Sequence, residues 1–325
     1  MANDLPRILV LGPPLIFRDF QSRYSHSYKF LNFFASSFSL PQFLSSLSIH
    51  PSSVRAILCN PMQRVPADVL RSLPSLGLIV TTSMGTDHID MAECRRLGVR
   101  VATAGGVYTE DVADLAVGLL IDVLMRISAA NRCVRKLLRS EEPRNTPPAS
   151  RVGGKRVGIV GLGKIGMEVA KRLEPFGCKI MYNSRTPKIS VPYPFYGSAV
   201  ELAANSDVLV LCCALTEQTH HIVDSQVMEA LGREGVIVNV GRGGLIDEKE
   251  LVRRLVNGQI GGAGLDVYEN EPHVPSELFS LDNVVLSPHA AALTSESFNQ
   301  ISNLVAANLR SFFEDKPLLT PVMEN

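Results

Sequence analysis

The chain has 325 residues, of which 46% are hydrophobic and 20% are charged, and this suits two globular domains of ordinary size. Lysine plus arginine and aspartate plus glutamate number 32 each, so no excess charge favours nucleic acid or an anionic membrane as a partner. These two classes of partner are therefore excluded, and any ligand must be recognised at a local site.

The first part of the chain alternates short apolar runs with helical patterns. Helices are predicted near 66–73 and 90–97. Strands are predicted at 7–12, 54–59, 77–82 and 99–103. Residues 13–50 hold seven of the thirteen phenylalanines without a clear period, which we interpret as extra core whose elements have no predictable ends.

A single long helix is predicted over 109–138, because acidic residues gather at its start and basic residues at its end, as the helix dipole favours. A proline-rich break follows at 143–148. Further strands are predicted at 156–161, 178–183, 207–213, 235–240 and 283–287. Strands that alternate with helices are typical of parallel sheets, so the predicted fold is α/β with two doubly wound domains.

The chain ends and the cysteines indicate a cellular setting. A strand that begins at Arg7 leaves no room for a signal or transit peptide, and no run of 18 apolar residues could span a membrane. The six cysteines show no metal-ligand spacing, and the pair Cys212–Cys213 ends an apolar run typical of a buried strand. We therefore expect a reduced, cytoplasmic protein with no bound metal and no membrane partner.

The strongest local motif is a G-x-G-x-x-G pattern formed by Gly161, Gly163 and Gly166. An apolar strand precedes it and an amphipathic helix follows it, which is the context that binding of a dinucleotide pyrophosphate requires. The residues expected from these motifs to bind the cofactor are Gly161, Leu162, Gly163, Lys164, Ile165, Gly166, Ser184, Arg185 and Thr186.

The second strand of this unit indicates which nicotinamide cofactor is used. NAD sites usually place an acidic residue about 20 residues after the glycines, where it binds the ribose 2′-hydroxyl. No acidic residue occurs from 177 to 200, and Arg185 stands at the expected position with Ser184 and Thr186 beside it. Since a guanidinium pairs with a 2′-phosphate, NADP(H) is favoured, while NAD(H) stays possible.

Three residues that could carry chemistry follow further along the chain. Arg242 lies between glycines at the end of a predicted strand, Glu271 precedes a proline, and His289 ends another strand in Ser-Pro-His. Each alone has an ordinary structural explanation, but an arginine, a carboxylate and a histidine together suit the reduction of a keto acid.

These motifs, in this order, resemble the D-isomer-specific 2-hydroxyacid dehydrogenase family over nearly the whole chain, in particular its plant glyoxylate/hydroxypyruvate reductase and hydroxyphenylpyruvate reductase branch. The resemblance implies that Arg242, Glu271 and His289 are catalytic. It implies as well that Val240 and Asp266 bind the cofactor and that Asp266 orients the nicotinamide. It also implies that Ser83, Met84 and Gly85 hold the substrate carboxylate together with Arg242.

The resemblance further implies the organisation of the chain. A flavodoxin-like substrate domain would comprise 1–104 and 291–325, a Rossmann coenzyme domain would comprise 105–290, and a homodimer would form through helix 109–138. The expected activity is NADPH-dependent reduction of hydroxypyruvate and glyoxylate. Two alternatives stay open: a preference for hydroxyphenylpyruvate, and a nicotinamide-sensing, co-repressor-like protein on the same scaffold.

Overall fold

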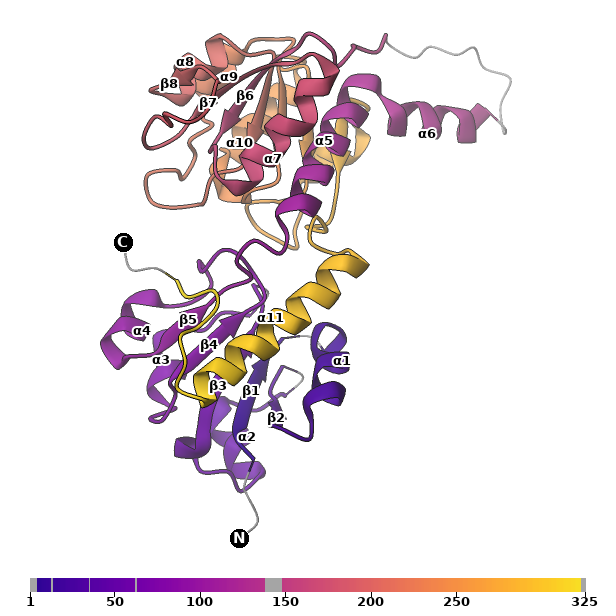
Figure 1. Ribbon diagram of the computed structural model, residues 1–325. Helices are drawn as coiled ribbons and strands as arrows, with labels where there is room; N and C mark the ends of the chain where they lie inside the picture. Colours follow the sequence, from indigo (N-terminus) through magenta and orange to yellow (C-terminus); the bar gives the residue numbers. More distant parts are fainter. Residues whose placement is uncertain (1–4, 13, 35, 62, 138–147, 323–325) are drawn as a thin grey trace. The chain divides into compact units, whose positions relative to one another are not determined.

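The computed structural model describes residues 5–12, 14–34, 36–61, 63–137 and 148–322. The chain divides into two compact units, the first comprising Met1–Tyr108 and Leu293–Asn325 and the second Thr109–Ala292 (Figure 1). Each unit is built on one parallel sheet, so the expected α/β class with two doubly wound sheets is confirmed. No described helix is long and apolar enough to cross a bilayer.

The first unit has a five-stranded sheet in the order β2-β1-β3-β4-β5, which is the flavodoxin-like order. Its strands are β1 (Arg7–Leu11), β2 (Lys29–Asn32), β3 (Val54–Cys59), β4 (Leu78–Thr81) and β5 (Arg100–Ala102). Its helices are α1 (Pro14–Tyr24), α2 (Leu40–Ser46), α3 (Ala67–Arg71), α4 (Met91–Leu97) and α11 (Ser295–Phe313), with a 3-10 turn η1 (Pro51–Ser53).

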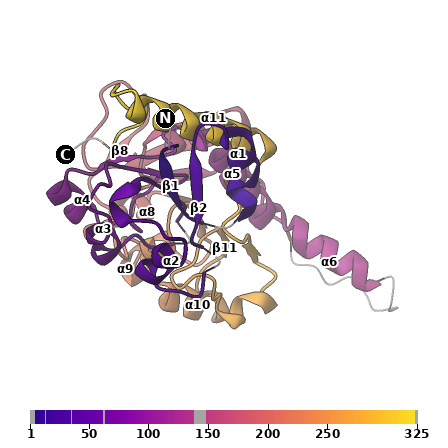
Figure 2. The same ribbon diagram turned by 90° about the horizontal axis from the view of Figure 1, so that it is seen from below.

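Helices cover both faces of this first sheet. Helices α2, α3 and α4 contribute Leu40, Leu70 and Cys94 to a core shared with the strands, while α1 and α11 contact each other. Figure 2 shows α1 and α11 side by side along the unit. The phenylalanine-rich stretch 13–50 contains α1, β2 and α2, and only part of it is core: Phe17 is buried, whereas Phe38 is exposed.

The second unit has a seven-stranded parallel sheet in the order β12-β11-β10-β9-β6-β7-β8, which contains the Rossmann order. Its strands are β6 (Arg156–Val160), β7 (Lys179–Asn183), β8 (Phe195–Tyr196), β9 (Val208–Leu211), β10 (Val236–Asn239), β11 (Gly262–Leu265) and β12 (Val284–Leu286). Its helices are α5 (Thr109–Met125), α6 (Ile127–Leu137), α7 (Lys164–Leu173), α8 (Ala199–Ala204), α9 (Ser225–Leu231) and α10 (Glu248–Val256), with 3-10 turns η2 (Glu174–Phe176), η3 (Gly243–Leu245) and η4 (Ser276–Ser280).

Every strand predicted with bounds forms within two residues of its expected ends. Strand β2 was expected within 13–50 without bounds, and β8 and β11 are not predicted by the sequence. Strand β11 is the important omission, because its sequence Gly-Ala-Gly-Leu lacks the β-branched residues typical of strands. The glycines are required by packing: a Cβ at Gly264 would lie 2.9 Å from Cβ of Leu119, and one at Gly262 would lie 2.8 Å from Val123. Both neighbours belong to α5, so this helix packs closely onto the strand.

The prediction of a single helix over 109–138 is wrong. Helix α5 ends at Met125 and α6 begins at Ile127, because Arg126 between them has a left-handed backbone with φ 54°. Leu138 lies outside the described residues. Helix α5 packs against α7, where Arg172 pairs with Asp114, whereas Figures 1 and 2 show α6 projecting from the body of its unit.

Candidate active site

The glycine motif forms the turn between β6 and α7. Gly161 has φ 96°, and a Cβ there would lie 2.6 Å from the backbone of Cys213, so only glycine fits. A Cβ on Gly166 would lie 2.4 Å from the carbonyl oxygen of Gly161. At Gly163, by contrast, an added Cβ would meet no atom of the described chain within 4 Å. Gly163 is exposed and caps α7, so the turn leaves this helix N-terminus open to an anion such as a pyrophosphate.

The other expected cofactor residues surround this turn or follow the neighbouring strands. Leu162 and Val240 are buried at the ends of β6 and β10, whereas Lys164 is exposed and Ile165 is half-buried. After β7, Ser184 Oγ donates to the Thr186 carbonyl at 2.6 Å. This hydrogen bond shapes a loop in which Arg185 is exposed, and the chemistry of the Arg185 guanidinium fits a 2′-phosphate.

Arg242 begins the turn that follows β10. The buried side chain of Asn239 holds this turn, because its Nδ2 donates to the Arg242 carbonyl at 2.9 Å and its Oδ1 accepts from the Gly241 amide at 3.0 Å. The Arg242 Nη1 donates to the Gly241 carbonyl at 2.8 Å. Asn239 is a functional position that no motif predicts, although an asparagine that ends an otherwise apolar strand is a usable signal.

Glu271 and His289 form a close pair. His289 Nδ1 lies 2.8 Å from Glu271 Oε2, and the backbone amide of Tyr268 donates to Glu271 Oε1 at 3.0 Å. Burial acts to raise the pKa of Glu271, but the hydrogen bond and charge of His289, the Tyr268 amide and the charge of Arg242 together bring this pKa below its usual value. Glu271 is therefore a carboxylate at neutral pH. Because this carboxylate pairs with Nδ1 of His289, Nε2 is the His289 nitrogen that can face a ligand.

Asp266 fixes the turn that carries His289. Its buried carboxylate accepts from Ser287 Oγ at 2.6 Å and from the amides of Ala290 and Ala291 at 2.8 and 3.2 Å. Its carbonyl accepts from the His289 amide at 2.8 Å. His289 has φ 54°, a conformation that costs free energy for a non-glycine residue and persists where such contacts determine it.

The loops after β10 and β11 touch through their backbones. A Cβ on Gly243 would lie 1.9 Å from the carbonyl carbon of Tyr268 and 2.3 Å from the amide nitrogen of Glu269. Strands β10, β11 and β12 are neighbours in a parallel sheet, so their carboxyl ends share one edge, where such sheets bind ligands. The structure thus brings the loops of Arg242, Glu271 and His289 to one edge of the second unit.

The turn expected to hold a carboxylate follows β4 in the first unit. The Ser83 hydroxyl bonds the Gly85 carbonyl at 2.6 Å and lies 2.9 Å from Thr81 Oγ1, which in turn lies 3.0 Å from His88 Nε2. Ser83 is buried, while Met84 and Gly85 are half-buried. The side-chain contacts hold the turn at the carboxyl end of its strand, a position suited to a ligand.

Known proteins share this architecture. A family model described as D-isomer specific 2-hydroxyacid dehydrogenase, NAD binding domain, matches residues 117–291. A glyoxylate/hydroxypyruvate reductase of Arabidopsis thaliana is 51% identical over 99% of this chain and 98% of its own. A hydroxyphenylpyruvate reductase of Plectranthus scutellarioides is 46% identical over 85% and 88%. The solved structure of an NADPH-dependent glyoxylate/hydroxypyruvate reductase from Sinorhizobium meliloti, in complex with NADP and malonate, is 35% identical, with TM-score 0.86 over 98% and 96% of the two chains.

Proposed function

The chain belongs to the D-isomer-specific 2-hydroxyacid dehydrogenase family, and on this basis we propose that it reduces hydroxypyruvate and glyoxylate to D-2-hydroxy acids with NADPH. One observation carries the proposal: at the edge of the second sheet, the loop of Arg242 contacts the loop of Glu271, which pairs with His289. Relatives that reduce these two acids support the choice of substrate. The D configuration of the product follows from family membership.

The roles of the three side chains follow from the charge changes of the reaction. Reduction of a keto acid adds hydride at carbon and a proton at oxygen, and a bound nicotinamide would supply the hydride. Arg242 would bind the substrate carboxylate and direct an N–H to the keto oxygen, where negative charge develops. His289 would donate the proton from Nε2, because Nδ1 is held by Glu271 at 2.8 Å. The Glu271 carboxylate would stabilise the charged imidazole before transfer.

The preference for NADPH rests on the loop after β7. No acidic side chain is present from 177 to 200 to bind a 2′-hydroxyl or to repel a 2′-phosphate, and Arg185 is exposed at the position of the usual acid. The NADPH-dependent relative supports this assignment. Ser184 and Thr186 would bind the same phosphate, and Asp266 would contact the nicotinamide while it holds the His289 turn.

We assign substrate binding to 1–104 and 291–325 and cofactor binding to 105–290. The observed division of the chain, after Tyr108 and after Ala292, supports this assignment, as does the family match at 117–291. In the substrate domain the amides of Met84 and Gly85 would hold the carboxylate, and Ser83 shapes their turn. The long, unbranched side chain of Met84 would adapt to small substrates and would occupy volume that a large one needs.

Hydroxyphenylpyruvate is the second candidate substrate, because a relative 46% identical is named for its reduction. A panel of hydroxypyruvate, glyoxylate, hydroxyphenylpyruvate and pyruvate, followed by the loss of NADPH absorbance, separates the candidates. We expect the highest kcat/KM with hydroxypyruvate or glyoxylate. A higher value with hydroxyphenylpyruvate would favour the second candidate. Tight NADPH binding without turnover of any acid would contradict the enzymatic proposal and favour a cofactor-sensing protein.

We also propose a homodimer formed through α5 and α6. Helix α6 projects from its unit and exposes Ile127 and Val134 by 53% and 56%, as Met125 beside it is exposed by 45% (Figure 1). Burial of this apolar surface against a second copy would stabilise the assembly. Light scattering of the full chain should give twice the mass of the monomer, and Ile127→Asp should lower it. A monomeric wild-type protein would contradict the proposal.

A further inference from the structure

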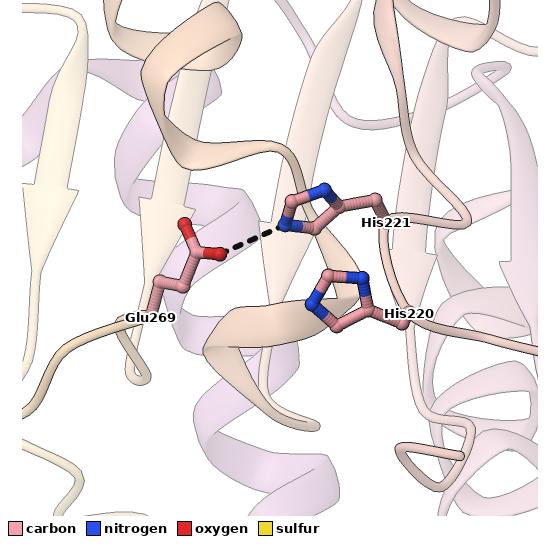
Figure 3. A group of neighbouring side chains, drawn as sticks. All are labelled: His220, His221 and Glu269. Carbon is pink, nitrogen blue, oxygen red and sulfur yellow. Dashed lines mark hydrogen bonds and ion pairs between the residues drawn. The ribbon is translucent and has the colours of Figure 1, made fainter. Parts of the chain in front are cut away.

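His220, His221 and Glu269 gather beside the catalytic loops but have no part in the proposed reaction (Figure 3). The histidines lie in the segment after β9, and Glu269 lies in the segment after β11. One nitrogen of each imidazole and one oxygen of the carboxylate all lie within 4.8 Å of one another. Among the described residues this is the one group of three or more such side chains that could hold a metal ion.

The backbones that carry these ligands are held in place. His221 has φ 52°, and its amide donates to the Gly244 carbonyl at 2.8 Å. The amide of Glu269 donates to Glu248 Oε2 at 3.0 Å, and Glu248 is buried. Two of the three ligands therefore stand on backbone positions that neighbouring segments fix, which reduces the conformational entropy lost when a metal binds.

The side chains already converge. His221 Nε2 lies 2.8 Å from Glu269 Oε1, and the two imidazole rings stack with centroids 3.9 Å apart at 27° (Figure 3). A zinc ion binds such ligands tetrahedrally at about 2.0–2.2 Å, which places the ligand atoms roughly 3.3–3.6 Å from one another. The most distant atoms of the group must therefore approach by on the order of 1 Å, while His221 and Glu269 separate slightly. His220 is exposed, and its side chain can make this movement at the surface.

We propose that His220, His221 and Glu269 form a binding site for a divalent transition-metal ion such as Zn²⁺. Two imidazole nitrogens and one carboxylate oxygen suit zinc and its neighbours, whereas Mg²⁺ and Ca²⁺ prefer oxygen ligands alone. The three protein ligands leave a fourth position for water. Binding at Nε2 of His221 replaces its hydrogen bond with Glu269, and the neutral imidazole then carries its proton on Nδ1. The expectation of no metal rested on the spacing of the cysteines; His221 and Glu269 lie 48 residues apart and form no local ligand motif.

Calorimetric titration of the full, metal-free chain with Zn²⁺ tests the proposal without reference to activity. We expect one strong site per chain, and His220→Asn, His221→Asn and Glu269→Gln should each weaken it at least tenfold. Asparagine is chosen at position 221 because it tolerates a positive φ. His273→Asn, which removes an exposed histidine from the same loop as Glu269, is the matched control and should leave binding unchanged.

A second measurement separates the loss of a metal ligand from the loss of metal binding by misfolding. Titration with Co²⁺ should give the visible absorption of a tetrahedral site in the wild-type protein and in His273→Asn, but not in His220→Asn, whose exposed position limits damage to the fold. Thermal unfolding in EDTA should give the same midpoint for these three proteins. The proposal is overturned if Zn²⁺ does not bind strongly, if the ligand variants bind it as the wild type does, or if the control loses binding equally.

Discussion

Replacement of Gly243 by alanine tests whether the contact between the Arg242 loop and the Glu271 loop matters for catalysis. The added Cβ would lie 1.9 and 2.0 Å from the carbonyl carbon and oxygen of Tyr268. Both sides of this contact are backbone, so no side-chain rotation can relieve it, and the loops must separate by about 1.5 Å to reach an ordinary contact distance. Such a displacement moves Arg242 relative to the Glu271–His289 pair, and a shift of this size can lower kcat/KM by about a hundredfold.

The same substitution should destabilise the second unit. Overpacking costs about 1–3 kcal/mol, and rigid backbone on both sides favours the upper end. For a unit of this size that corresponds to a melting temperature lower by roughly 6–12 °C. Gly244→Ala is the matched control, because its Cβ would lie 3.3 Å from the end of the Leu215 side chain, which can move. Steady-state kinetics and thermal unfolding of both variants give the answer. Wild-type kcat/KM in Gly243→Ala, or equal losses in both variants, would refute the reasoning.

Three further predictions concern the cofactor and the proton donor. Arg185→Ala should remove charge-assisted bonds of about 1.5–3 kcal/mol and raise the KM for NADPH roughly ten- to hundredfold, with the KM for NADH nearly unchanged; equal effects on both cofactors would contradict the 2′-phosphate role. Gly163→Ala should weaken binding of NADPH in a fluorescence titration without a change in melting temperature, since its Cβ meets no described atom within 4 Å. Gly166→Ala should lower the melting temperature, because its Cβ would lie 2.4 Å from a carbonyl oxygen. The opposite ranking of the two melting temperatures would show that the turn packs differently. Because the pKa of Glu271 is lowered, its charged contact with His289 is present at neutral pH and is lost only as the pH falls through that lowered value. Glu271→Gln removes the negative charge that favours the proton-donating imidazolium, so as the pH rises the reductase rate in EDTA should begin to fall at a lower pH than in the wild type. An unshifted profile would assign Glu271 another part.

Much of the fold is predictable from local sequence because strands and turns leave strong signals. Buried parallel strands are continuous apolar runs, so β6 and β10 are recognised with nearly correct ends. The glycine motif at Gly161 is recognised because a turn that approaches another backbone excludes side chains. Strand β11 escapes recognition for the same reason: helix α5 approaches it so closely that glycine replaces the residues typical of strands.

The break between α5 and α6 shows a second kind of limit. The charge pattern of 109–138 favours one helix, and Arg126 carries no glycine or proline signal that would end it. Its positive φ nevertheless separates the two helices. Helix propensity is a weak local preference of a fraction of a kcal/mol per residue, so tertiary packing can override it at a single position.

The candidate site, too, is predictable from the sequence only in part. The identities of Arg242, Glu271 and His289 are readable from the sequence, because each stands in a short motif at the end of a strand. The sequence does not show that Asn239 holds the arginine turn, that Asp266 holds the histidine turn, or that His221 meets Glu269 across 48 residues. Those contacts join segments that only the order of strands in the sheet brings together. Local sequence determines which groups are available for chemistry, whereas their distances depend on long-range strand pairing, which no short motif encodes.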